Sequence, residues 1–552
     1  MARHERGRLA ATDPGRHTDR LPTPGPHRQP GAGADLEPAA EPGADRGADR
    51  AHRGLHYGPY RKDPMTDIRW VCISDLHLGA LNSLLTNVSA DGESVDGTAP
   101  APVMTALCAC LRSLRAPGQD PPQLVVLGDL FELALTTPED AASTFSQLIG
   151  TLQPGGPGSA IGPVIRFVPG NHDHHLWSRA SDDRFLQVLE QDAAAMPTPR
   201  DRHATRLLPA NDQIPVRDRF VEILANRGRA GSPIAVEQSY PNLGLVTPSG
   251  TRAVVLSHGH YIEPLYRMMS LLDRALGTPR PGGDEAWQLE ADNGGWIDFF
   301  WSSMGDSGDI MRITRSLYES LQSQEAVHAE IQAIERAIKV AGKSRARADI
   351  EAHAVAILLE AGVGTALRER HRPGVLLSPN AEEGLVAYLD GPVTVQTTAE
   401  IGSPDDLTFI FGHTHKPFVD TRTTASFPAP VGVVNTGGWV VDTPQRTAIK
   451  GAALVLIDDE LNVASVRCYA EGDDPSSYLV HIEAANGGSS NRLVDELRST
   501  IDTGRDPWAG LAQAIQEAVT ERGRQLDERL HADASTLDQL NREIRQAEGK
   551  SG

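Results

Sequence analysis

The stretch Ile68-Arg-Trp-Val-Cys-Ile-Ser-Asp-Leu-His77 joins an apolar run to an Asp-x-His pair. Residues two apart in an extended backbone face the same side, so Asp75 and His77 can point into one cavity. In later segments polar residues again follow apolar runs: Gly128-Asp129, Gly170-Asn171-His172-Asp173, His258-Gly259-His260 and Gly412-His413-Thr414-His415. Their carboxylates, amide and imidazoles are suitable ligands for two divalent cations.

The apolar runs before these segments predict buried β-strands. They cover residues 68–74, 123–127, 164–168, 252–256 and 407–411, and helical patterns cover 101–115 and 139–150. Apolar runs separated by helices are typical of an α/β fold, in which polar residues at the carboxyl ends of strands form the site. Residues 432–439 and 451–457 are further strand candidates, which we expect in a second sheet.

Composition and pattern divide the chain into four parts. Residues 1–64 have almost no large apolar side chains, so we expect a disordered tail. Residues 65–261 and 400–475 form the predicted core, and 262–399 form a helical insertion that we expect to act as a cap. Residues 488–552 are a polar, charged helical region, expected to be a C-terminal appendage.

Charge and cysteine content narrow the class of protein. The formal net charge of -21 over 552 residues argues against a general binder of nucleic acids or anionic membranes. The four cysteines form no disulfide or zinc framework, and Cys108 and Cys110 are interpreted as free thiols. Because the chain has no long apolar run and no signal-peptide pattern, we expect a cytoplasmic protein without a membrane span.

The five polar segments allow one assignment of ligands to two metals, with Asp129 as the bridging carboxylate. We assign one metal to Asp75, His77, Asp129 and His415, and the other to Asp129, Asn171, His258 and His413. Two divalent cations, two carboxylates and one hydroxide leave a charge of about +1, which attracts a phosphate. We expect manganese, with iron, zinc or another divalent metal as alternatives.

Two further residues are candidates for catalysis. His172 lies beside a ligand and is assigned to protonate the leaving group, with Asp173 orienting its ring. A bridging hydroxide would attack phosphorus in line. We expect Glu132, His174, His175 and His260 to lie on the surface or behind the ligands rather than to bind metal.

The ordered segments resemble the signature blocks of the calcineurin-like metallophosphoesterase superfamily: D-x-H, G-D, G-N-H-D, H-G and G-H-x-H. Val434-Asn-Thr-Gly-Gly-Trp439 is similar to the N-x-G-x-W block that often follows. The resemblance covers about residues 68–260 and 405–457, and implies a two-sheet sandwich flanked by helices with a dinuclear centre. It also implies the same roles for the seven ligands and His172.

Within the superfamily, the first two segments look most similar to the UDP-2,3-diacylglucosamine hydrolase branch. The long insertion departs from that branch, and His260 stands where an aspartate is usual. The substrate is therefore not carried over from the resemblance.

The function expected from these residues is metal-dependent hydrolysis of a phosphate ester or phosphoanhydride. The substrate would be a small phosphorylated molecule, such as a nucleotide or a lipid-linked phosphate. One alternative is a nuclease or phosphodiesterase acting on nucleic acid, against which the acidity counts. Another is a non-catalytic scaffold, against which the complete ligand set and His172 count. The oligomeric state is left open.

Overall fold

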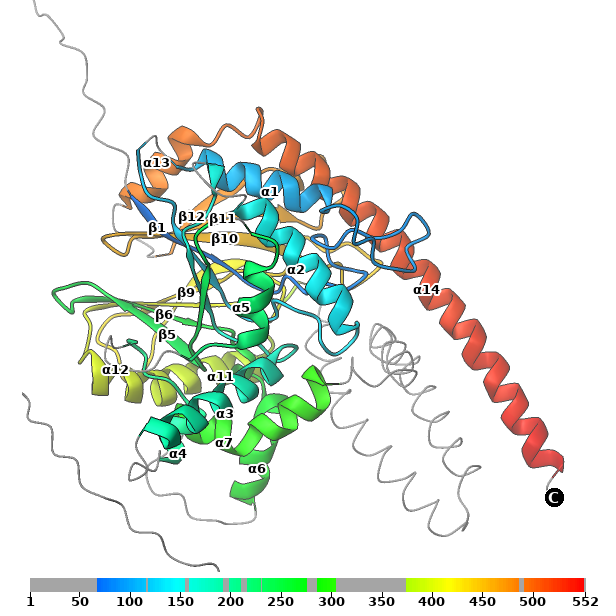
Figure 1. Cartoon of the computed structure of the whole chain (residues 1–552), viewed down its shortest axis with the longest axis horizontal. Helices are drawn as coiled ribbons and strands as arrows, with labels where there is room; N and C mark the ends of the chain where they lie inside the picture. The colour runs from blue at the N-terminus through cyan, green and yellow to red at the C-terminus, as the bar shows by residue number, and fades with distance from the viewer. Residues whose placement is uncertain are drawn as a thin grey trace, which may run out of the picture. The chain divides into compact units, whose positions relative to one another are not determined.

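Two mixed β-sheets flanked by helices form the fold of the computed structural model (Figure 1). The structure describes residues 67–115, 118–153, 158–191, 198–209, 216–229, 231–275, 285–303, 374–485 and 491–550. The predicted tail over 1–64 and the middle of the predicted insertion, residues 304–373, lie outside the described residues. The prediction of an α/β protein with two sheets between helices is confirmed.

The first sheet has seven strands in the order β12-β11-β10-β1-β2-β3-β4. Strands β1 to β4 are parallel, and β10, β11 and β12 extend the sheet from β1 in antiparallel fashion. The bounds are β1 Ile68–Ile73, β2 Gln123–Val126, β3 Val164–Phe167, β4 Ala235–Gln238, β10 Gly451–Asp458, β11 Val463–Ala470 and β12 His481–Ala484.

The second sheet has five strands in the order β5-β6-β7-β9-β8, of which β6, β7 and β9 are parallel. The bounds are β5 Asn242–Val246, β6 Arg252–Ser257, β7 Asp406–Phe411, β8 Phe418–Arg422 and β9 Val431–Asn435. Only one of the two late strands lies here: β9 does, but β10 pairs with β1 in the first sheet. The expectation that both belong to a second sheet is wrong for β10.

The two sheets pack face to face through alternating side chains. Cys72 and Val125 of the first sheet meet Val254 and Ile410 of the second in one buried apolar cluster. The neighbouring residues on each strand face outward, where Val71 packs in a second cluster with helices. Because side chains alternate along a strand, one apolar run serves both layers.

Helices cover the outer face of the first sheet. Thr137 caps the N-terminus of α2, since its hydroxyl accepts a hydrogen bond from the amide of Asp140, and Pro138 occupies the first turn. The same sheet and its helices bury the four free cysteines. The helices of this layer include α1 Pro102–Ser113, α2 Pro138–Leu152 and α5 Arg219–Asn226, whereas α3 His174–Gln191 and α4 Pro199–His203 pack beside the helices of the insertion.

The described part of residues 262–399 is helical and packs on the second sheet. Its Leu289 and Leu385 share an apolar cluster with Phe409 of β7. The bounds are η2 His260–Ile262, η3 Pro264–Arg267, α6 Met268–Ala275, α7 Ala286–Ile297, η4 Asp298–Ser302, α11 Pro379–Tyr388, η6 Leu389–Val393 and α12 Thr394–Glu400.

The C-terminal region is helical but is more than an appendage. It comprises η7 Pro475–Tyr478, α13 Arg492–Thr500 and α14 Trp508–Lys550. Trp508, Leu511 and Ile515 of α14 are buried in the cluster that covers the first sheet, and α14 runs beside α1 (Figure 1). The first part of α14 is therefore a layer of the core, a role that the polar composition of this region obscured.

Candidate metal centre

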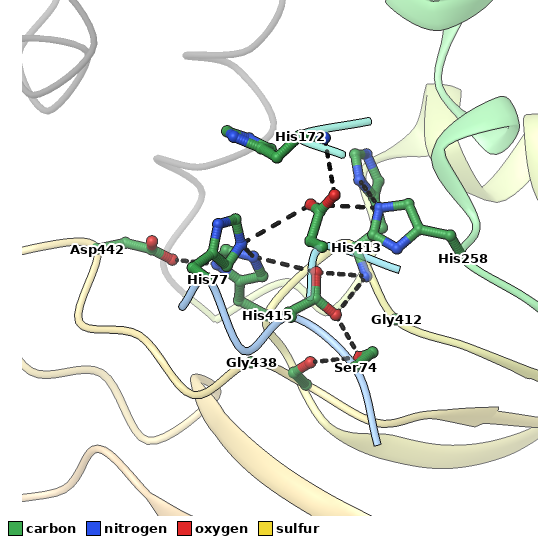
Figure 2. A network of polar contacts seen from close by, with 12 residues as sticks. Ser74, His77, His172, His258, Gly412, His413, His415, Gly438 and Asp442 are labelled. Carbon is green, nitrogen blue, oxygen red and sulfur yellow. Dashed lines mark hydrogen bonds and ion pairs between the residues drawn. The ribbon is translucent and has the colours of Figure 1, made fainter. Parts of the chain in front are cut away.

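The sharp turns after five parallel strands bring the predicted ligands together. Asp75 follows β1, Asp129 follows β2 and Asn171 follows β3, whereas His258 follows β6 and His413 follows β7. The carboxyl ends of strands in both sheets meet at one place, which is the usual location of a site in open α/β sheets. Figure 2 shows the imidazoles of His77, His258, His413 and His415 gathered there.

The backbone at these ligands is strained. Five ligands have a positive φ: Asp75 at 51°, His77 at 44°, Asp129 at 48°, His413 at 69° and His415 at 56°. Among the described non-glycine residues, only Leu461 shares this conformation. The left-handed region costs a non-glycine residue about 1–2 kcal/mol, and such strain clusters at functional sites. Strain concentrated at five predicted ligands is a feature typical of functional sites.

The first group of ligands contains Asp75, His77 and His415. Nδ1 of His77 donates to Glu132 over 2.8 Å, and Nδ1 of His415 donates to Asp442 over 2.8 Å. In neutral rings the two Nε2 atoms therefore carry lone pairs, yet they lie only 3.3 Å apart. Nε2 of His415 also lies 3.3 Å from Oδ1 of Asp75. A cation between these atoms would turn their mutual repulsion into attraction.

The second group contains Asp129, His258 and His413. Nδ1 of His258 donates to the carbonyl of Leu127 over 2.8 Å, so in a neutral ring Nε2 is an acceptor. That Nε2 lies 3.0 Å from Oδ1 of Asn171 and 3.2 Å from Nδ1 of His413. Again several electron-pair donors face one another.

Asp129, a member of the second group, also faces His77 of the first. Its Oδ2 is 3.7 Å from Nε2 of His77 and 3.4 Å from Nε2 of His258, while Oδ1 accepts a hydrogen bond from the amide of His172 over 2.8 Å. This central location is the one expected of a carboxylate that bridges two metals. The bridging role itself stays a prediction.

The donor set fits divalent cations. Metal–ligand bonds of about 2.1 Å place neighbouring ligand atoms roughly 3.0 to 3.4 Å apart in octahedral or tetrahedral geometry. The donor atoms lie 3.0–3.7 Å from one another, which is close to that spacing. Buried groups of aspartate and histidine in this protein could therefore hold metal ions.

The field at the imidazoles favours cations. Burial alone would lower the pKa of His258, but the nearby carboxylate of Asp129 outweighs it and raises this pKa to about 9. Burial opposes protonation of His415 as well, and Asp442 and Asp75 raise its pKa to about 10. The same negative potential that holds a proton on these rings would attract a metal ion.

The orienting partner of His172 is Glu132, not Asp173. Nδ1 of His172 lies 2.7 Å from Oε1 of Glu132. Burial alone would raise the pKa of Glu132, but the imidazoles of His172 and His77 hold it at about 2, so its carboxylate is ionised and accepts from both rings.

The carboxylate of Asp173 makes a different set of contacts. It accepts hydrogen bonds from the amides of Gly170 and Leu130, each over 2.7 Å, and of Phe131 over 3.3 Å. Asp173 thus closes the loop that carries Asn171 and His172 onto the loop after β2. The expectation that it orients the His172 ring is replaced by this role.

The remaining histidines of these segments lie behind the ligands or at the surface, as expected. His260 is buried, and its Nε2 contacts the hydroxyl of Tyr240 over 2.9 Å. His174 is buried between Glu290 at 2.9 Å and Asp298 at 2.7 Å, both from the insertion. His175 is exposed.

Sequence reasoning missed two carboxylates of the site. Asp442 contacts His415, and Glu263 lies 3.2 Å from Nε2 of His413. Asp442 follows shortly after the N-x-G-x-W block, a position that offered a weak signal, whereas no pattern marks Glu263.

A small cavity of about 40 Å³ opens beside the ligands. His413 and His415 form one wall, and Tyr266 and Trp301 of the insertion form another. The insertion therefore contributes to the surroundings of the centre.

Neither a scan against protein-family models nor a search of curated proteins finds a match to this chain. In the part of the chain that the structure describes, no helix combines the length and the apolar character needed to cross a membrane.

Proposed function

We propose that this chain is a dinuclear metal-dependent phosphoric ester hydrolase of the calcineurin-like metallophosphoesterase superfamily. One observation carries the proposal: aspartates and histidines that could hold metal ions gather around Asp129, with ring nitrogens of four imidazoles turned inward. The ordered signature segments in the sequence support it independently.

The assignment of residues to two metals follows the two groups. Asp75, His77 and His415 would hold the first cation, and Asn171, His258 and His413 the second, with Asp129 shared. Two such cations, when bound, supply Lewis acidity to a phosphate and a nucleophilic water at neutral pH. Manganese is our first choice of metal, with iron and zinc as alternatives.

His172 would act on the leaving group. Glu132 holds its Nδ1, so a proton would be delivered to the leaving oxygen from Nε2. The cavity beside His413, with Lys416 and Lys450 in its lining, would admit the phosphate group. Its aromatic wall from the insertion supports the role of the insertion as a cap, and the substrate would be a small phosphorylated molecule.

The test is hydrolysis of a chromogenic phosphomonoester and a chromogenic phosphodiester by purified protein with added Mn²⁺. His172→Ala should keep the metals and lose rate by roughly 10²-fold or more. Asp129→Asn should lose both metal and rate. The matched control is His175→Ala, because this neighbouring histidine is exposed and should leave the rate unchanged. Absence of turnover with Mn²⁺, Fe²⁺ and Zn²⁺ would instead favour a non-catalytic scaffold.

A further inference from the structure

The two groups of ligands differ in what supports their histidines from behind. In the first group, His77 is held by Glu132 and His415 by Asp442. Both carboxylates belong to the core. In the second group, His258 is held by the carbonyl of Leu127, which also belongs to the core.

His413 is the exception, because its support comes from the insertion. Oε1 of Glu263 lies 3.2 Å from Nε2 of His413, and the ring of Tyr266 packs edge-on against His413 with centroids 5.0 Å apart. Glu263 lies between η2 and η3, where the chain leaves the core. Glu263 and Tyr266, the two neighbours of His413, are almost fully buried.

The root of the insertion, residues 260–267, is in turn fixed by helices further along the insertion. Nε1 of Trp296 in α7 donates to the carbonyl of Leu265 over 3.3 Å, and the hydroxyl of Tyr261 donates to Glu290 over 3.0 Å. Gly384 of α11 packs so closely on the root that a Cβ there would overlap the carbonyl oxygen of Ile262. The position of Glu263 therefore depends on the docking of α7 and α11.

We propose that the second metal position is filled only when the insertion is docked, because Glu263 at its root orients His413. This inference rests on the proposed function and names a way in which the same centre is regulated. The first position has its histidine supports wholly within the core and should bind metal whether or not the insertion is docked. Carboxylates behind a ligating histidine fix its ring and typically change metal affinity 10- to 100-fold.

The experiment is a calorimetric titration of the full chain with Mn²⁺, together with electron paramagnetic resonance of the spin-coupled Mn²⁺ pair. Glu263→Leu removes the acceptor at similar size and should weaken one of two Mn²⁺ sites 10- to 100-fold, leaving the other unchanged. Glu263→Gln keeps an acceptor and should show a smaller loss. Asp442→Leu should weaken the other site, so that the double variant loses both.

A distant pair of glycine variants tests the link to docking. Gly384→Ala should push α11 off the root and weaken the same site as Glu263→Leu. Gly295→Ala in α7 is the matched control, since a Cβ there meets no atom within 4 Å, and it should bind Mn²⁺ as the wild type does.

The outcomes separate the two proposals. Two wild-type sites that Glu263→Leu and Gly384→Ala leave unchanged would overturn the inference and spare the proposed function. A double variant that retains one tight site would show that Glu263 and Asp442 act on the same metal, which also overturns it. Wild-type protein that binds no pair of Mn²⁺, Fe²⁺ or Zn²⁺ ions would overturn the proposed function itself. If Gly384→Ala fails to fold, the Glu263 variants still decide.

Discussion

Replacing Gly128 by alanine should disrupt the centre through sterics alone. Gly128 joins β2 to Asp129 with a φ of 79°. A Cβ at this position would lie 2.6 Å from the Cα of Gly170 and equally close to Cγ of His258. No real Cβ tolerates such contacts, so the loops that carry Asn171 and His258 must move apart.

Comparison with a second glycine separates two contributions to the loss of stability, backbone strain and overpacking. Gly250, in the turn between β5 and β6, has a similar φ of 73°, but a Cβ there meets nothing within 4 Å. Gly250→Ala should therefore cost only the left-handed backbone, about 1–2 kcal/mol, less roughly 0.4–1 kcal/mol from the stiffer unfolded chain. Gly128→Ala adds an overpacking cost of about 1–3 kcal/mol.

Urea unfolding with EDTA present measures this difference without any contribution from metal. We expect Gly128→Ala to be less stable than Gly250→Ala by about 1–3 kcal/mol. We also expect only Gly128→Ala to lose affinity for Mn²⁺, because His258 and Asn171 are displaced. Equal stability of the two variants, or normal Mn²⁺ binding by Gly128→Ala, would refute the close packing on which the centre depends.

Saturating Mn²⁺ should raise the urea midpoint of the wild type, and EDTA should reverse the effect. A ligand at a hundredfold excess over Kd adds about 2.7 kcal/mol to the free energy of unfolding. An unchanged midpoint would contradict metal binding. Glu132→Gln should lower kcat at saturating Mn²⁺ by about 10-fold or more, because the carboxylate of Glu132 holds both His77 and His172. An unchanged kcat would show that Glu132 does not orient these rings for catalysis. His174→Gln should cost about 3–5 kcal/mol near neutral pH by leaving Glu290 and Asp298 without their cation. These carboxylates outweigh burial and raise the pKa of His174 from 6.5 to about 10, so the stabilisation is complete below pH 6.5 and is lost as the pH approaches 10. The unfolding free energies of wild type and variant should therefore converge with rising pH, and a constant gap would disprove the pairing.

The convergence of the predicted ligands could be foreseen from the sequence because local rules place them. Each follows an apolar run that forms a strand, and the carboxyl ends of such strands converge whatever the loops between them do. Spacing of two residues then orients the pairs Asp75/His77 and His413/His415. These rules need no knowledge of distant contacts.

The errors arise where distant contacts decide the outcome. Asp173 is adjacent to His172 in the sequence, but its carboxylate turns back to backbone amides, and Glu132 reaches the ring from another loop. Glu263 meets His413 across 150 residues. Short edge strands such as β4 and β8 have mixed compositions, AVEQ and FVDTR, that resemble loops. The choice of sheet for β10 likewise depends on pairing with β1.

Each proposed metal position would draw its ligands from both sheets of the sandwich. The first combines Asp75 and His77 with His415, and the second combines Asp129 with His258 and His413. Neither half of the polypeptide, expressed alone, would contain a complete site. Assembly of the centre therefore requires both sheets, and bound ions would link side chains across the interface between the sheets. Removal of the ions by a chelator should therefore weaken the contact between the two sheets.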